Sequence, residues 1–212
     1  MIRFLHGPLR VGLGALFVLE LACGGSSPVA AVGSGGSSLA VEARADETFG
    51  PVAGFVLTDQ NGERFGLEDL LGKPFVAAAI FTTCAGPCPR ITGHMKKLQD
   101  ELAGGDVRLV SISVDPQYDT PEILSDYAER WGADTERWSF LTGEKKAVFD
   151  LVQQGLWLSV QDDPEAARGF HVTHRTSIVA VDRKGERRGW YEGSDPGEVE
   201  LLIERMRFLS GE

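Results

Sequence analysis

Two cysteines four residues apart, Cys84 and Cys88, are the residues of this chain whose type and spacing most directly indicate chemistry. They lie in residues 81–89 (FTTCAGPCP), between an apolar run of strand length and an amphipathic helical pattern. The start of a helix stabilises a thiolate, and a thiolate attacks disulfides or binds soft metals. The pair therefore predicts redox or metal chemistry, because core packing alone requires neither flanking prolines nor a helix start.

The spacing Cys-x-x-x-Cys is one residue longer than the Cys-x-x-Cys of ordinary dithiol oxidoreductases. Two thiols in this arrangement can close a disulfide, and they can equally offer two soft ligands to an ion such as Cu(I). Copper held by two thiolates usually takes a third ligand, and imidazole suits both of its oxidation states. The cysteines by themselves leave redox and metal chemistry about equally open.

The four histidines differ in their suitability as that third ligand. His6 lies in the N-terminal segment, and His94 is expected to face solvent on the polar side of the helix after Cys88. His171 and His174 precede a predicted strand at residues 176–181, and in an extended chain residues three apart point to opposite faces. Only one of this pair should face the cysteines. His174 is the candidate, with a histidine that merely caps or packs as the alternative.

The elements that must position these residues alternate along the chain. The apolar runs at residues 75–81 and 107–114 predict strands buried on both faces. The helix after Cys88 is predicted from one stripe of apolar residues: Ile91, Met95, Leu98 and Leu102. Further patterns predict a hairpin around residues 59–62, a short helical turn at 67–71, helices at 120–132, 143–154 and 196–209, strands at 138–141, 176–181 and 188–191, and a loop at 155–169.

This order predicts an α/β fold with a mixed sheet, helices on both faces and an N-terminal β-hairpin extension. A strand that feeds a helix beginning at paired cysteines is the thioredoxin-like arrangement, which we predict here. In such a sheet the loop before the strand at residues 176–181 lies beside the cysteines, where thioredoxins place a cis-proline. This chain has no proline in that loop, and a histidine takes the place.

Three further residues and one acidic run could belong to the functional site or to the structure around it. Asp115 follows a strand whose end should lie near the cysteines, so an electrostatic role at the site is one interpretation. Asp119, before Thr120 and Pro121, is predicted to belong to a helix cap. Trp157 is either a partner-docking residue or a packing residue. The acidic run at residues 162–165 either attracts a positively charged partner or is a solvated face.

Composition narrows the function classes. The 212 residues include 21 basic and 31 acidic side chains, a net charge of −10 without a basic stripe, which argues against nucleic acid as a partner. Three cysteines are too few for a disulfide-stapled scaffold.

The N-terminal segment predicts export. Residues 1–23 combine Arg3 and Arg10 with a short apolar run at 11–19, as an export signal does. Residues 19–23 (LELAC) resemble a bacterial lipoprotein box, although Glu20 and Leu21 depart from it. We expect a lipid anchor at Cys23, with simple cleavage or an uncleaved anchor as alternatives. Residues 24–48 then form a flexible linker and residues 49–212 the folded domain, at the outward face of the cytoplasmic membrane or in the periplasm.

Three motifs together carry a family resemblance. They are residues 81–89 (FTTCAGPCP), residues 113–121 (SVDPQYDTP), and a late histidine followed by an apolar strand and Asp-x-x-Gly at residues 174–185. In this order they resemble the Sco/SenC family of copper chaperones, and the resemblance covers about residues 50–209. It implies a thioredoxin-like fold, one bound copper and a role in assembling the dinuclear copper centre of cytochrome c oxidase.

The resemblance also implies a ligand set. Carried over to this chain, the copper ligands are Cys84, Cys88 and His174. Many members have an aspartate before the histidine, whereas this chain has Thr173. That difference removes a carboxylate next to the ligand and bears on copper affinity.

The leading hypothesis is a membrane-tethered copper metallochaperone, not an enzyme, that delivers Cu(I) or Cu(II) to the copper-bearing subunit of cytochrome c oxidase. A copper donor protein or a thiol reductase would be a further partner. The alternative is a thiol–disulfide reductase, with Cys84 and Cys88 as catalytic residues, that keeps the partner's copper-site cysteines reduced. A peroxiredoxin-like peroxidase is suggested by the fold alone and is weak.

Overall fold

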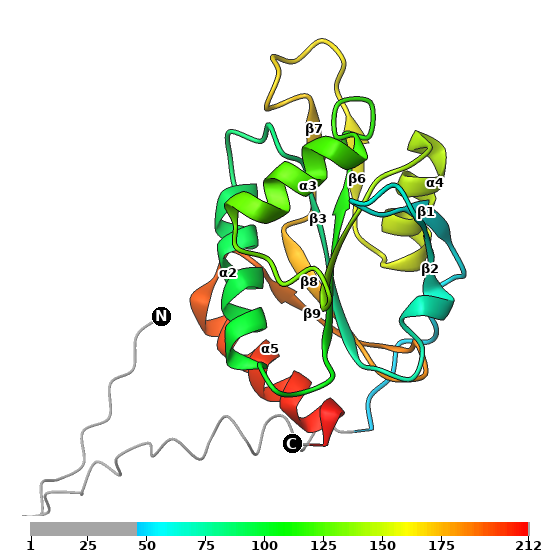
Figure 1. Cartoon of the computed structure of the whole chain (residues 1–212), viewed down its shortest axis with the longest axis vertical. Helices are drawn as coiled ribbons and strands as arrows, with labels where there is room; N and C mark the ends of the chain where they lie inside the picture. Colours follow the sequence, from blue (N-terminus) through cyan, green and yellow to red (C-terminus); the bar gives the residue numbers. More distant parts are fainter. Residues whose placement is uncertain (1–45, 212) are drawn as a thin grey trace, which may run out of the picture. The chain divides into compact units, whose positions relative to one another are not determined.

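A five-stranded mixed sheet lies at the centre of the computed structural model, which describes residues 46–211 (Figure 1). The strand order is β5-β4-β3-β8-β9, in which β3, β4 and β5 are parallel, β8 runs antiparallel to β3, and β9 runs antiparallel to β8. The strands are β3 (Phe75–Ile80), β4 (Arg108–Ser113), β5 (Trp138–Leu141), β8 (Ser177–Val181) and β9 (Arg187–Glu192). This confirms the predicted thioredoxin-like mixed sheet.

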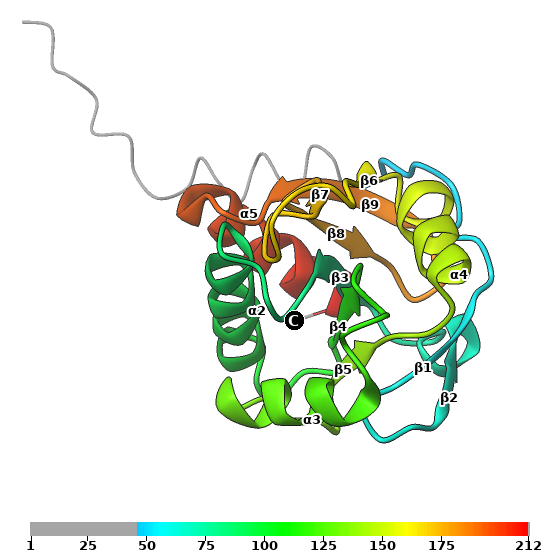
Figure 2. The same ribbon diagram turned by 90° about the horizontal axis from the view of Figure 1, so that it is seen from above.

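Helices cover both faces of the sheet, as predicted. Figure 2 shows α2 and α5 on one side of the sheet, and α4 with the β1–β2 hairpin on the other. The third helix, α3, lies beside α2, where the Tyr127 hydroxyl is 2.8 Å from Thr92 Oγ1. The helices are α2 (Cys88–Glu101), α3 (Pro121–Arg130), α4 (Lys145–Asp150) and α5 (Pro196–Ser210), and α4 continues into a π-helical turn at Leu151–Gly155. The hairpin comprises β1 (Val56–Thr58) and β2 (Arg64–Gly66), and a 3-10 turn at Leu67–Asp69 follows it.

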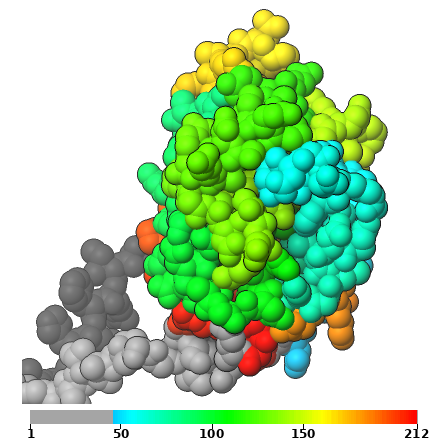
Figure 3. All heavy atoms as spheres, viewed as in Figure 1, coloured from blue at the N-terminus to red at the C-terminus, as the bar shows by residue number. Residues whose placement is uncertain are grey.

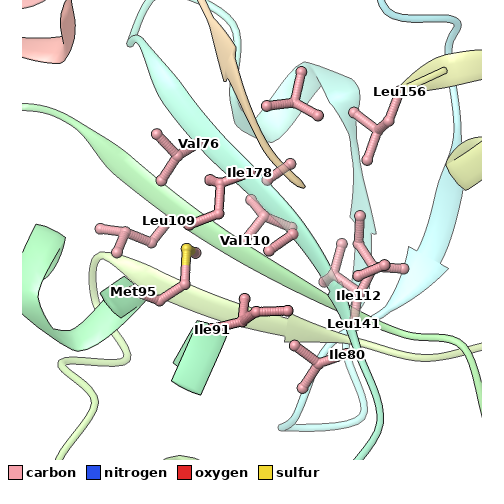
Figure 4. Packing of buried hydrophobic residues seen from close by; sticks show 14 of the residues in the cluster. Val76, Ile80, Ile91, Met95, Leu109, Val110, Ile112, Leu141, Leu156 and Ile178 are labelled. Atoms are coloured by element: carbon pink, nitrogen blue, oxygen red, sulfur yellow. The ribbon is translucent and has the colours of Figure 1, made fainter. Parts of the chain in front are cut away.

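The core lies between these layers. All six residues of β3 are buried, which explains why this strand has a continuous apolar sequence rather than an alternating one. The predicted stripe of α2 is confirmed, because each of its four members is fully buried. Figure 4 shows two of them, Ile91 and Met95, in the same apolar cluster as Leu109 and Val110 of β4. Each buried side chain of this size stabilises the fold by about 1.5–3 kcal/mol.

Two local predictions need correction. The predicted loop at residues 155–169 begins in the π-helical turn and contains β6 (Val160–Asp162), which pairs antiparallel with β7 (Val172–His174). These three-residue strands have no periodicity that a sequence pattern could reveal, and their partners lie ten or more residues apart. The predicted helix at residues 143–154 begins later, at Lys145, and changes to π geometry after Asp150.

The N-terminal predictions lie outside this part of the chain. The expected export signal at residues 1–23 and the expected linker up to residue 45 are not described by the structure. Within residues 46–211, no helix combines the length and the apolar character needed to cross a membrane.

A buried arginine joins the start of the domain to the sheet. Arg187 is 3 % exposed, and its Nη1 and Nη2 donate to the carbonyls of Gly155, at 2.5 Å, and Phe49, at 2.9 Å. Its guanidinium lies 3.9 Å from the centre of the Trp157 ring, which stacks on Trp190. Trp157 therefore packs against the domain, although 53 % of it stays exposed.

We expect Arg187→Leu to lower the free energy of unfolding by about 2–4 kcal/mol, because two carbonyls at a buried site lose a charged donor. Denaturant unfolding of the purified protein measures the change. Arg207→Leu is the matched control, since Arg207 is 43 % exposed and pairs with Glu101 at the surface, so its loss should cost less than about 1 kcal/mol. Equal losses in the two variants would contradict this account of Arg187.

Candidate functional site

The two cysteines lie where β3 meets α2. Residues 81–87, here named the Cys loop, connect Ile80 at the end of β3 to Cys88, the first residue of α2. Proline at the beginning of a helix is favourable because its missing N–H is not needed there, and Pro87 and Pro89 flank the first residue of α2. Both cysteines are free thiols; Cys84 is half-buried and Cys88 is fully buried.

His174 lies next to the buried cysteine. It is the last residue of β7, and its Nε2 lies 3.4 Å from the Sγ of Cys88. Its Nδ1 lies 3.0 Å from the carbonyl oxygen of Arg175, which can only accept, so the ring proton is on Nδ1. The lone pair on Nε2 is therefore directed towards the sulfur. Burial lowers the pKa of His174, so the imidazole is neutral, the form that binds metals.

The two thiols hold their protons very differently. A hydrogen bond from Cys88, aided by the backbone N–H of Gly86 and opposed by burial, lowers the pKa of Cys84 to about 6. The same hydrogen bond to Cys84, together with burial, raises the pKa of Cys88. At neutral pH Cys84 is thus a thiolate and Cys88 a thiol. The position of Cys88 at a helix start does not lower its pKa overall, because the hydrogen bond to Cys84 and the burial of the sulfur both favour the thiol.

The sulfurs of the two cysteines and the imidazole nitrogen of His174 suit a soft metal, but they do not surround a common point closely enough to form a finished metal site. Cys84 and His174 line one cavity of about 170 Å³, whose wall also contains Pro87, Phe170 and Thr173. Among residues 46–211, no group of three or more His, Cys, Asp or Glu side chains is arranged closely enough to hold a metal ion. Two sulfurs and one imidazole nitrogen nevertheless match the ligand preference of copper, and the same sulfurs could form a disulfide.

Asp119 holds the Cys loop in place through hydrogen bonds. The predicted helix cap at residues 119–121 is confirmed at Thr120, whose side chain accepts from the Ile123 N–H, but Asp119 takes no part in it. The fully buried Asp119 carboxylate instead accepts from the N–H of Thr82, at 3.0 Å, and from the hydroxyls of Thr82 and Ser113. Burial raises its pKa despite these hydrogen bonds. The signal in the sequence was the motif at residues 113–121, but its contact with the Cys loop required the tertiary structure.

His94 and His171 have partners other than the sulfurs. The prediction that His94 faces solvent is wrong: this residue is half-buried, and its Nδ1 lies 2.8 Å from the carbonyl oxygen of Gly193. His171 faces Asp115, with its Nε2 3.0 Å from Asp115 Oδ2. The expectation that only one of His171 and His174 faces the cysteines is thereby confirmed.

We expect the alkylation rate of Cys84 by iodoacetamide to rise with pH through a midpoint near 6, because its lowered pKa yields thiolate above that pH. Peptide mass spectrometry after brief labelling measures each cysteine separately. In Cys88→Ala the donor is gone, so the midpoint should move up towards the ordinary value of about 8.5. A midpoint near 6 that persists in Cys88→Ala would contradict the assigned cause.

The chain matches one family of known proteins along most of its length. Residues 43–207 match the family model described as SCO1/SenC. The SCO1 protein homolog of Bacillus subtilis (strain 168) is 30 % identical over 158 residues, which cover 74 % of this chain and 81 % of that protein.

Solved structures of the same family share the fold. A SCO1/SenC family lipoprotein from Bacillus anthracis str. Ames is 33 % identical, with a TM-score of 0.71, over 77 % of this chain and 98 % of its own. BsSco, described with a disulfide switch as a member of the Sco family of cytochrome c oxidase assembly proteins, is 29 % identical, with a TM-score of 0.67, over 78 % of this chain and 96 % of its own. The copper-bound ScoI of Bradyrhizobium japonicum, 23 % identical with a TM-score of 0.64, covers 75 % of this chain and 99 % of its own, and shows the likeness of fold. The match over most of the chain confirms the resemblance seen in the three motifs, and the protein belongs to the SCO1/SenC family.

Proposed function

We propose that this protein is a copper metallochaperone that binds its cargo through Cys84, Cys88 and His174 and delivers it to the copper-bearing subunit of cytochrome c oxidase. The observation that carries the proposal is the contact of 3.4 Å between His174 Nε2 and Cys88 Sγ, with the ring proton held on the opposite nitrogen. A redox dithiol needs no such imidazole, whereas a copper ion held by two sulfurs does. Membership of a family that includes oxidase assembly proteins supports the same function.

The proton distribution suggests how cargo is taken up. Cys84, half-exposed and already a thiolate, meets the ion first, and the neutral His174 offers its Nε2 without losing a proton. Cys88 must release its proton on binding, so one proton competes with copper at this sulfur. Release to a partner then proceeds by ligand exchange: partner thiolates replace the three ligands in turn, and Cys88 takes up a proton again. No electron transfer is needed.

We also propose that the domain is tethered outside the cytoplasm. The export signal at residues 1–23 and the lipoprotein box ending at Cys23 support this, as does the name lipoprotein given to the Bacillus anthracis relative. Residues 24–48, whose Gly/Ser/Ala-rich composition is typical of a linker, would let the domain reach both a copper donor and the oxidase subunit.

A thiol–disulfide reductase is the second candidate, favoured by one observation. Cys84 has a lowered pKa and Cys88 is its hydrogen-bonded neighbour, which is how an attacking and a resolving thiol are arranged. The disulfide switch described for the BsSco relative fits the same pair. In this reaction the Cys84 thiolate attacks a partner disulfide and releases one partner thiolate, leaving a mixed disulfide. Cys88 loses its proton to a released partner thiolate and attacks the Cys84 sulfur, which displaces the second partner thiolate. The partner leaves with both cysteines reduced, while Cys84 and Cys88 form a disulfide.

We expect anaerobic titration of the reduced protein with Cu(I) to show one tight site per chain that is lost in Cys84→Ser and weakened by about 100-fold or more in His174→Ala, because a ligand is removed in each. Competition with a chromogenic chelator measures the affinity. His94→Ala is the matched control, since that histidine is also half-buried and bonded to a carbonyl, and it should bind like the parent.

Unchanged copper binding in His174→Ala would reject the proposed ligand set. Turnover of a partner disulfide by a protein that binds no copper would favour the reductase instead.

A further inference from the structure

A short two-stranded arm carries His174. It comprises residues 160–174, in which β6 pairs with β7 so that Val160 lies opposite His174. Between the two strands the chain turns back over residues 163–171, and Asp163 N–H donates to the His171 carbonyl at 2.7 Å. Figure 3 shows this part of the chain, in yellow, protruding from the top of the molecule. The position of His174 therefore depends on what fastens the arm to the sheet.

His171 makes a largely buried polar contact between the arm and the segment after β4, besides the more exposed ion pair of 2.6 Å between Asp162 of β6 and Lys145 of α4. Its Nε2 lies 3.0 Å from Asp115 Oδ2, and the two side chains are only 20 % and 11 % exposed. Asp115 follows the end of β4, the strand that pairs with the central strand β3. The N–H of Gly169 donates to His171 Nδ1 at 3.3 Å, which places the ring proton on Nε2, facing the carboxylate. Both ring nitrogens are thus occupied, so His171 is arranged to hold the arm and not to bind metal.

Two weaker contacts flank this one. The carbonyl of Gly169 accepts from the N–H of Ala85 in the Cys loop, at 3.3 Å. A side chain at Gly169 would approach the Thr83 carbonyl to 2.9 Å, and the φ of 91° at this residue also favours glycine. On the other side the guanidinium of Arg168 lies 3.7 Å from the centre of the Tyr118 ring. The arm thus touches both the Cys loop and the segment after β4, with His171 between these contacts.

Building on the proposed function, we infer that His171 is a positioning residue: by donating to Asp115 it fastens the arm to the end of β4 and holds His174 within reach of Cys88. Three residues of extended chain span about 10 Å, so an anchor at His171 restricts His174 closely. The Phe81 ring lies between the two histidines, 5.5 Å from the His171 ring and 6.1 Å from the His174 ring, both edge to face. A displaced His171 would free one side of this aromatic contact and let His174 move from the sulfur.

Amide hydrogen exchange of the copper-free full chain tests the fastening itself. We expect His171→Leu, which fills the space but cannot donate, to speed exchange at Ala85 and Phe170 by about 10-fold to 100-fold, the effect of losing one hydrogen bond to a charged group. His171→Gln keeps a donor and should restore most of the protection. Met95 in the core of α2 reports global unfolding and should exchange as in the parent.

Asp115→Leu tests whether the two residues act together. If His171 and Asp115 act together, Asp115→Leu speeds amide exchange in the arm as much as His171→Leu does. The double variant then exchanges no faster than either single variant. Additive effects would overturn the pairing. His94→Leu is the control for loss of a half-buried histidine, and it should leave the arm unchanged.

Copper binding then separates this inference from the proposed function. We expect His171→Leu to weaken copper binding by about tenfold and to reduce the nitrogen hyperfine signal of His174 in the Cu(II) spectrum, with recovery in His171→Gln. If the parent binds no copper, the proposed function fails while the exchange data still decide the fastening. If the parent binds copper and His171→Leu matches it in affinity and spectrum, the positioning role is overturned.

Discussion

The site depends on one constraint, the position of β3 in the sheet. This strand pairs with β4 in parallel and with β8 in antiparallel orientation, so Ile80 lies beside Ser113 and Ala78 beside Ile178. The C-terminal ends of β3 and β4 and the N-terminal end of β8 therefore meet at one edge. This arrangement brings three parts of the site together: the Cys loop, the two aspartates after β4, and His174 before β8. These three parts of the site are far apart in the sequence.

The hydrogen bond between the two cysteines, together with burial, determines which of them keeps its proton. The sulfur of Cys88 lies inside the core cluster, where a thiolate is costly, while the half-exposed Cys84 receives hydrogen bonds that stabilise its negative charge. One proton is thus kept between two sulfurs and next to a neutral imidazole. Such a site is ready for copper or for a disulfide, and His174 is the residue that separates the two chemistries.

Two carboxylates after β4 support two halves of the site. Asp119 receives hydrogen bonds from Thr82 and so holds the Cys loop, while Asp115 faces His171 and so holds the arm. Both carboxylates come from one short segment that follows one strand. The two cysteines and the histidine, although carried by separate elements, are therefore oriented from a common base.

The sheet, the buried stripe of α2 and the three candidate donor residues could be predicted from the sequence, because periodic apolar patterns and short motifs are local signals. Tertiary structure alone decided the arm, the partners of Asp119 and His171, the burial of His94, and which thiol keeps its proton. These features arise from contacts between residues far apart in the chain, as between Cys88 and His174, 86 positions apart. Their energies depend on desolvation and on hydrogen-bond partners, which exist only after the chain has folded.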